Sequence, residues 1–172
     1  GHVHAARPGY ALDAGELYTR FTPTGDGGED FEVSQVKAQA NVKVHADQQK
    51  ATLYGDRLTA STAEQKVEVY GTPETLARVV RADGVITGEH FIFEQTRESF
   101  RAVGPGAADL DVTQKDGSNL DVVVNWRDEM SYDAPQDELT FAGAVDATTT
   151  NATEKTHLTA QQLKLIFTKP VA

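Results

Sequence analysis

The residues of this sequence best suited to bind a metal are its five histidines: His2, His4, His45, His90 and His157. Zinc sites gather histidine and cysteine at short, characteristic spacings, and this chain has no cysteine. Only His2 and His4 are neighbours, and an extended segment would place both imidazoles on one side. Such a pair is more typical of a tag remnant or a frayed end. We therefore expect no metal site and no cofactor.

Four aspartates form the densest acidic stretch: Asp109, Asp111, Asp116 and Asp121. Calcium prefers grouped carboxylates, but the ligand order of known calcium loops is missing, and Asp116-Gly117 has the pattern of a hairpin turn. Glu94 and Glu98 flank another turn, and glycosidases use paired carboxylates of this kind. Polar residues occupy comparable places in several hairpins, so solvation explains these glutamates better than catalysis.

The residue patterns of the common enzyme classes are missing. No serine stands in a G-x-S-x-G elbow, no cysteine is present, and no glycine-rich phosphate loop precedes a helix. A net charge of −10, with sixteen scattered Lys and Arg, argues against binding to nucleic acid. A carbohydrate-binding jellyroll would need aromatic platforms on a solvated face, and Trp126 is the only tryptophan. We expect no enzyme, no catalytic residue and no nucleic-acid partner.

The elements that must position any site come from an internal repeat of 14 residues that ends in glycine. Its copies align without gaps as LTASTAEQKVEVYG (58–71), FIFEQTRESFRAVG (91–104), MSYDAPQDELTFAG (130–143) and the weaker VKVHADQQKATLYG (42–55). Apolar or small residues occupy positions one and three, a polar run follows, and apolar residues return at positions ten and twelve. Alternation, a polar turn and renewed alternation predict one β-hairpin for each copy.

Further hairpins are predicted between these copies. Val79-Val80 and Val85-Ile86 bracket the turn residues Ala82-Asp83-Gly84, and a longer alternating pair from Leu110 to Trp126 surrounds Asp116-Gly117. Leu158, Leu163, Leu165 and Phe167 alternate with polar residues near the end of the sequence. The best helical candidate, 75–81, is short and contains β-branched valines. The sequence therefore predicts an all-β fold made of repeated antiparallel hairpins.

A chain of 172 residues is long enough for one domain with its own core, so we expect a single domain over 1–172. Residues 1–10 are expected to be flexible or left over from processing or expression. The longest apolar stretches are far shorter than the roughly 20 residues of a membrane-spanning helix. Stacked hairpins would leave open edge strands at both ends, which invite another copy or another partner.

The order and spacing of three segments resemble the OstA-like family of periplasmic lipopolysaccharide-transport proteins. These segments are AQANVKV (38–44), GDRLTA (55–60) and KVEVYGTP (66–73), and a second round reads TGEHFIF (87–93) and closes at FRAVG (100–104). The resemblance extends from about Leu12 to Phe167. The family commonly has glycine before the Asn-Val pair, where this chain has Ala40.

This resemblance implies a folded-over β-jellyroll, or β-taco, whose apolar groove shields acyl chains. The inward residues that would line such a groove are Leu58, Val67, Val69, Ile86, Phe91, Phe93, Phe100, Tyr132, Leu139, Phe141, Leu163, Leu165 and Phe167. The alternative is that they fill a closed core. Four arginines are candidates to meet lipid phosphates or are ordinary solubilising charges: Arg78, Arg81, Arg97 and Arg101.

The function implied by the resemblance is non-enzymatic. The chain is expected in the periplasm, where it would bind lipopolysaccharide or a similar amphiphile and help to bridge the inner and outer membranes. Its other expected partners are OstA-like domain proteins, joined through edge strands, and further copies of itself. The alternative function is a lipid-free scaffold of the cell envelope in which stacked hairpins present edges for β-augmentation.

Overall fold

The computed structural model describes residues 1–24, 30–47, 50–114 and 117–167, and these form an all-β protein. Thirteen strands make one antiparallel sheet. The strands are β1 (Val3–Arg7), β2 (Tyr10–Ala14), β3 (Glu16–Thr24), β4 (Asp30–Ala46), β5 (Ala51–Ser61), β6 (Lys66–Tyr70), β7 (Ala77–Arg81), β8 (Gly84–Glu94), β9 (Ser99–Thr113), β10 (Asn119–Trp126), β11 (Glu129–Asp133), β12 (Glu138–Thr150) and β13 (Lys155–Ile166). Within the described residues, the only helical element is a 3-10 turn, η1 (Gln95–Arg97).

The long strands change partners midway, and this divides the sheet into two parts, which we call leaf A and leaf B. Leaf A contains β1, β2, β7, β10 and the segments 42–46, 51–55, 84–88, 106–113, 145–150 and 155–160. Leaf B contains β3, β6, β11 and the segments 30–39, 57–61, 90–94, 99–103, 138–142 and 162–166. Because the same strands cross from one leaf to the other, the leaves share one continuous sheet.

The predicted repeat corresponds to hairpins with a common register. In the three stronger copies, position one pairs with position twelve: Leu58 with Val69, Phe91 with Ala102, and Met130 with Phe141. All three copies lie in leaf B. The weaker copy lies in leaf A with its register shifted, so that Val42 pairs with the final Gly55. Each copy of the repeat thus forms an antiparallel hairpin, as the alternation and the polar turns predicted.

The inward rows of the two leaves meet in one apolar core. In leaf B the central row runs across the strands as Ala38, Leu58, Val69, Phe91, Ala102, Met130, Phe141 and Leu163. In leaf A it runs as Leu12, Val44, Leu53, Val79, Ile86, Ala108, Val124, Ala147 and Leu158. Buried residues of both rows belong to a single hydrophobic cluster, and no charged or polar residue among those described is buried.

The leaves approach most closely at the edge where the long strands cross, which we call the closed edge. There Trp126 of leaf A packs against Phe141 of leaf B, with ring centroids 5.4 Å apart. The indole N–H of Trp126 donates to the carbonyl oxygen of Gly104 at 3.0 Å. A Cβ on Gly106 would lie 2.2 Å from the indole, so only glycine leaves room for this ring. Register shifts between Gln39 and Val42 in β4 and between Ala142 and Val145 in β12 occur where these strands cross between the leaves at this edge.

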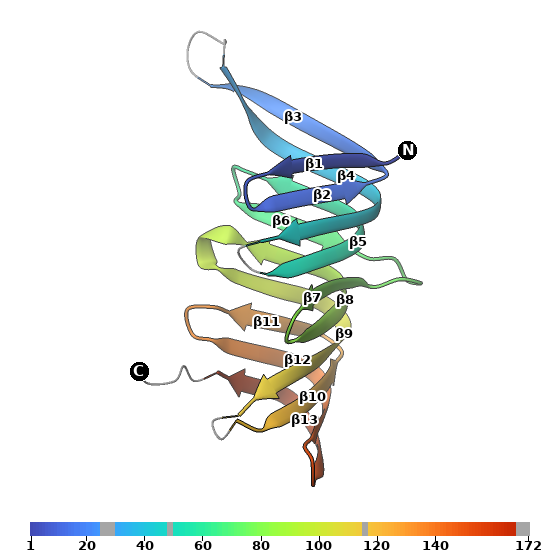
Figure 1. Ribbon diagram of the computed structural model, residues 1–172, viewed down its shortest axis with the longest axis vertical. Helices are drawn as coiled ribbons and strands as arrows, with labels where there is room; N and C mark the ends of the chain where they lie inside the picture. Colours follow the sequence, from blue (N-terminus) through green and yellow to red (C-terminus); the bar gives the residue numbers. More distant parts are fainter. Residues whose placement is uncertain (25–29, 48–49, 115–116, 168–172) are drawn as a thin grey trace.

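The strands stack across the long axis of the molecule, with β1 and β3 at one end and β13 at the other (Figure 1). β1 pairs only with β2, β3 only with β4, and β13 only with β12, so each end presents an edge strand. The β3–β4 hairpin extends beyond the stack and exposes Phe21 and Phe31, whose exposed fractions are 58% and 61%. At the other end Leu158 and Ile166 are exposed.

One local expectation needs correction. Residues 1–10, expected to be flexible or left over from processing or expression, contain β1 and the start of β2, because Val3–Arg7 pairs in register with Tyr10–Ala14. Cross-strand pairing here outweighs a weak local preference. Residues 75–81, which the sequence analysis did not count as a helix, include β7, and its Val79 and Val80 pair with both β5 and β8. The predicted turn between β7 and β8 is present, with Arg81 opposite Gly84.

Candidate functional site

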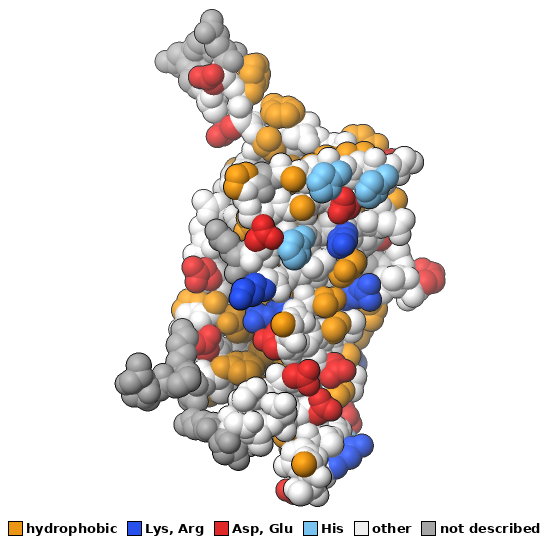
Figure 2. Space-filling model, in the orientation of Figure 1, with side chains coloured by type: hydrophobic (Ala, Val, Ile, Leu, Met, Phe, Trp, Pro, Cys, Tyr) orange, Lys and Arg blue, Asp and Glu red, His pale blue; other side chains and the backbone are white. Residues whose placement is uncertain are grey.

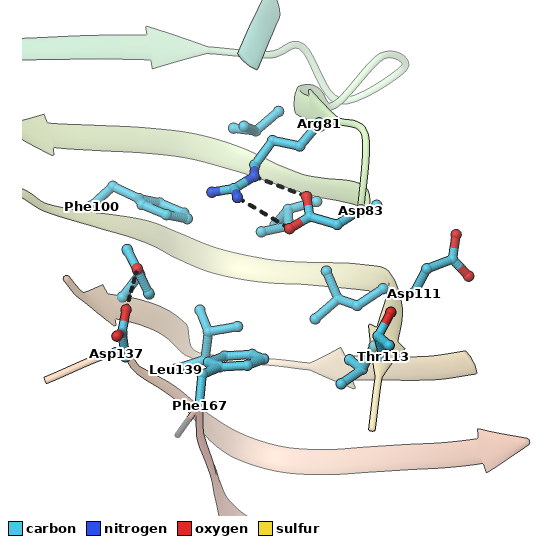
Figure 3. A pocket seen from close by; sticks show the side chains of 14 residues that line it. Arg81, Asp83, Phe100, Asp111, Thr113, Asp137, Leu139 and Phe167 are labelled. Atoms are coloured by element: carbon cyan, nitrogen blue, oxygen red, sulfur yellow. Dashed lines mark hydrogen bonds and ion pairs between the residues drawn. The ribbon is translucent and has the colours of Figure 1, made fainter. Parts of the chain in front are cut away.

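A hollow with an apolar interior, a cavity of about 420 Å³, lies between the two leaves at the edge opposite the closed edge (Figure 3). We call this side the open edge. Leaf A contributes the β7–β8 hairpin and β9, and leaf B contributes β9, β11 and β12. The lining residues are Val79, Arg81, Asp83, Gly84, Ile86, Phe100, Leu110, Asp111, Val112, Thr113, Tyr132, Asp137, Leu139 and Phe167.

The leaf A wall follows from strand alternation. Arg81 is two residues beyond inward-facing Val79, so its side chain starts on the inner face of the leaf. It lies next to Gly84, which has no side chain to fill the space and pairs with Leu110 of β9. A Cβ on Gly84 would be 2.3 Å from the carbonyl oxygen of Asp109, which explains the glycine. Glycine at this position thus lets β8 lie close to the backbone of β9 beside the cavity.

The leaf B wall is aromatic. Phe100 and Tyr132 lie side by side on neighbouring strands with ring centroids 5.5 Å apart, and Phe93, which does not line the cavity, stacks on Phe100 at the same distance. The hydroxyl of Tyr132 donates to the carboxylate of Asp137 at 3.3 Å. The backbone N–H of Phe167 donates to the carbonyl oxygen of Asp137 at 2.8 Å, which holds the end of the described chain beside the cavity. This wall offers flat apolar surface with polar groups only at its rim.

An arginine and an aspartate stand together at the cavity mouth. The Nε of Arg81 donates to Asp83 Oδ1 at 2.9 Å, and its Nη2 donates to Asp83 Oδ2 at 3.1 Å. The two side chains are about half exposed. These two hydrogen bonds form a bidentate ion pair, or fork. Because Asp83 is in the turn directly after β7, the short loop itself holds the carboxylate beside Arg81. The site therefore combines an apolar interior with a charged but internally paired rim.

The thirteen predicted groove residues fall into two groups. Five of them line the cavity: Ile86, Phe100, Tyr132, Leu139 and Phe167. The others pack in or against the closed core: Leu58, Val67, Val69, Phe91, Phe93, Phe141, Leu163 and Leu165. Phe91 and Phe141 are almost completely buried by neighbouring side chains. Strand alternation identified the inner face, and the structure distinguishes the part of that face that is hollow.

Val79, Leu110 and Val112 also line the cavity, although the sequence analysis did not include them among the groove residues. Each stands in a strand pair that the analysis did predict, between the copies of the repeat. Their alternation with outward-facing residues in those strands is the sequence signal that could have identified them as inward residues. The groove prediction drew mainly on the repeat copies, and three of the four copies lie in leaf B. The missed residues come from leaf A.

Of the four arginines proposed to meet lipid phosphates, only Arg81 lines the cavity. Arg78 lies over the ring of Tyr54, with its guanidinium carbon 4.3 Å from the ring centroid. Arg97 and Arg101 make ion pairs with Glu94 and Glu129, and both line a second hollow of about 620 Å³ that has no apolar interior wall comparable to the first.

A separate cluster surrounds His90 on the outer face of leaf B. His90 stacks on Tyr70 with ring centroids 4.0 Å apart, and the guanidinium of Arg57 lies 4.3 Å from the same Tyr70 ring. Nε2 of His90 is 3.5 Å from Glu68, which also pairs with Lys66 at 2.9 Å. Burial lowers the pKa of His90, and the negative charge of Glu68 opposes this shift only in part.

The other candidate sites can be placed as follows. In the part of the chain that the structure describes, no group of three or more His, Asp or Glu is arranged to hold a metal ion. His4 hydrogen bonds to Asp13, and this lowers the pKa of the Asp13 carboxyl. Asp111 and Asp121 are direct cross-strand neighbours, while Asp116 lies outside the described residues. Trp126 is 3% exposed and offers no platform for a sugar.

No protein-family model matches the chain, and no curated protein matches it significantly. Among the described residues, no helix is long and apolar enough to cross a membrane.

Proposed function

We propose that this protein is a non-enzymatic carrier of lipopolysaccharide or a similar amphiphile, working in the periplasm as part of a bridge between the inner and outer membranes. The observation that carries the proposal is the apolar cavity between the leaves at the open edge. Its volume of about 420 Å³ falls within the range of about 300 to 1,000 Å³ that is common for small-molecule sites.

The two-leaf arrangement supports this proposal together with the sequence resemblance to OstA-like proteins. A sheet folded at one edge and open at the other is what a β-taco requires. An acyl chain entering the open edge would contact Val79, Ile86 and Leu110 on one side and the aromatic wall on the other. Burial of apolar surface contributes roughly 25 cal/mol for each Å² removed from water, so the tail would supply most of the affinity.

Photo-crosslinking tests whether amphiphiles occupy the cavity. A photoreactive benzoylphenylalanine would replace Phe167, which lines the cavity and is already aromatic and partly exposed. The matched control carries the same group in place of the adjacent Ile166, which is more exposed and does not line the cavity. After expression with export to the periplasm, adducts should form at position 167 and be several-fold fewer at 166.

Native mass spectrometry of the unmodified protein should then show adducts with lipid masses. Equal crosslinking at the two positions, together with a protein free of lipid after gentle purification, would count against a carrier. If the cavity stays empty in the presence of added amphiphile, its lining residues have only a structural role in core packing.

The second candidate function is a lipid-free envelope scaffold, and the open edges at both ends of the stack favour it. Edge strands with exposed apolar residues are suited to β-augmentation. Phe21 and Phe31 stand at one end, and Leu158 and Ile166 at the other. Joining these ends would add strands to the sheet, either between copies of this chain or with other OstA-like domain proteins.

Analytical ultracentrifugation over a concentration series tests this scaffold. Phe21→Lys and Ile166→Lys each place a charge at one end and should abolish concentration-dependent assembly without changing lipid adducts. A wild-type protein that stays monomeric at high concentration would rule out a scaffold of self-assembled copies and would not affect the carrier proposal.

A further inference from the structure

The cavity at the open edge has an end in both directions along the stack of strands. On the leaf B side, one inward row crosses the strands in direct register as Val67, Phe93, Phe100, Tyr132, Leu139 and Leu165. The middle three, Phe100, Tyr132 and Leu139, line the cavity. Phe93 and Leu165, one strand further out on either side, pack against the hydrophobic core instead. The hollow part of leaf B is therefore three strands wide, or about 10 Å between the outer strand axes.

Leaf A is hollow over the same number of strands. β7, β8 and β9 each contribute two inward residues to the lining: Val79 and Arg81, Gly84 and Ile86, Leu110 and Val112. On the strands to either side, Leu53 and Val122 are buried and do not line the cavity. Toward the closed edge, Ala108 and Phe141 are completely buried and end the cavity in depth. The cavity is thus one compartment with packed side chains on every side except the mouth.

The volume of this compartment sets how much of a ligand it holds. An apolar cavity of about 150 Å³ holds one benzene molecule, with its six carbon atoms. The present cavity, at about 420 Å³, is just under three times as large. At the same filling it holds roughly 15 carbon atoms. This is the size of one acyl chain and about half of what two such chains need.

We infer that the cavity holds a single acyl chain of about 12 to 16 carbon atoms, and that Phe93 and Leu165 are the end stops that limit its length. This inference rests on the proposed binding of amphiphiles and adds the number and length of the chains that are held. A ligand with several chains inserts one of them and keeps the others, with its head group, at the mouth. Methylene groups beyond the end stops remain in water and add no affinity.

The test uses octyl, decyl, dodecyl, tetradecyl, hexadecyl and octadecyl maltoside, which carry one chain each. Their common head group is uncharged, so the acidic and basic side chains that Figure 2 shows on the surface do not bias the comparison. Native mass spectrometry of the full chain with an equimolar mixture, below the lowest micelle concentration, ranks the probes by mass. Occupancy should rise by up to about fourfold for each methylene from octyl to dodecyl. Beyond tetradecyl it should level off, with one molecule bound to each protein.

Two leucines of β13 provide a matched pair of variants. Leu165→Ala removes the end stop beside Leu139, and the space that it frees should move the levelling point to chains longer by about two carbon atoms. Leu163→Ala makes the same change on the same strand, beside Phe141, which does not line the cavity. It should leave the levelling point unchanged. Phe93→Ala should act at the other end as Leu165→Ala does.

A filling variant keeps the inference testable where a truncated variant folds poorly. Val112 lines the cavity and is partly exposed, so Val112→Phe adds atoms inside the compartment. The levelling point should move to chains shorter by about two to four carbon atoms. The control is Val123→Phe, which makes the same change at an exposed position outside the cavity and should move nothing. Thermal unfolding of each variant checks that it is folded.

The outcomes distinguish this inference from the proposed function. Occupancy that keeps rising steeply to octadecyl maltoside, or two molecules bound to one protein, overturns the single chain while the amphiphile site stands. A levelling point that moves equally in Leu165→Ala and Leu163→Ala, or that stays in place in Val112→Phe, overturns the inference in the same way. If no maltoside binds at any chain length, the carrier proposal fails together with the inference.

Discussion

The closed edge and the open edge of this molecule are built from the same strands but have opposite properties. At the closed edge, Trp126 and Phe141 fill the space between the leaves, and Gly106 lets the ring lie directly on the backbone. At the open edge, Phe100 and Leu139 face Ile86 across a cavity. A folded sheet can thus keep its stability at one edge and leave space for a ligand at the other.

Truncation of one aromatic residue at each edge tests this division most severely. Phe141→Ala should lower the free energy of unfolding by about 3 to 5 kcal/mol, because Phe141 is completely buried. Phe100→Ala removes the same atoms from a half-buried side chain that already borders a cavity, and it should cost less than half as much. Urea unfolding followed by tryptophan fluorescence measures both. Equal losses would show that the open edge is as tightly packed as the closed one.

A methyl-bearing side chain at Gly106 should have the next largest effect. Gly106→Val places a Cβ 2.2 Å from the Trp126 ring and 2.4 Å from the carbonyl oxygen of Thr87. We expect a loss of about 2 to 3 kcal/mol and a shift in Trp126 fluorescence as the indole moves. The control is Ala107→Val, one residue further along β9 on the other face, which should change stability little. An unchanged fluorescence spectrum in Gly106→Val would contradict the close contact.

A gain of stability is expected at a corner of the closed edge. Ala40 has φ 62°, a left-handed conformation that costs a residue with a Cβ roughly 1 kcal/mol. Ala40→Gly should therefore raise the free energy of unfolding by about 0.5 to 1 kcal/mol after allowing for the added freedom of the unfolded chain. Asn41 has φ 56°, and since asparagine tolerates this region, Asn41→Gly should gain less. Thermal denaturation ranks the two, and a loss of stability in Ala40→Gly would show that its methyl group has a packing role.

The smallest effect concerns pH and lies outside the core, at His90. Because burial lowers its pKa, the unfolded chain takes up a proton at higher pH than the folded chain does. Stability should decline as the pH falls through the unfolded value near 6.5 and stop declining, for this residue, below the folded pKa. Comparing wild type with His90→Gln by urea unfolding at several pH values isolates this contribution. Identical profiles would mean that the histidine is solvated in the folded protein.

The hairpins were predictable because each carries its own signal. Alternation at Leu58 and Ala60, a polar turn, and renewed alternation at Val67 and Val69 determine both the turn and the face of the strand. The continuity of the long strands had no such signal. β9 passes through Gly104, Pro105 and Gly106, which read locally as a break, yet it continues to Thr113. The bend at these residues is what transfers the strand from one leaf to the other.

The cavity was predictable only in part. Its walls come from inward positions, which alternation reveals, but its volume depends on which residues of leaf A oppose which residues of leaf B. Gly84, Arg81 and Asp83 are among the residues that line the cavity, and no periodic pattern marks them. The first ten residues escaped prediction for a similar reason, since β1 has little apolar pattern and is held by its pairing with β2.

The stacking of strands across the long axis also determines how the molecule would respond to force. β1 and β13, the first and last strands of the sequence, lie toward opposite ends of the stack, and tension between them would act along the inter-strand hydrogen bonds rather than across them. Bonds loaded in this direction open one pair at a time, as a zipper does, instead of resisting together in shear. Such a protein would lengthen by successive release of hairpins under low load and would re-form them in order when the tension is relaxed.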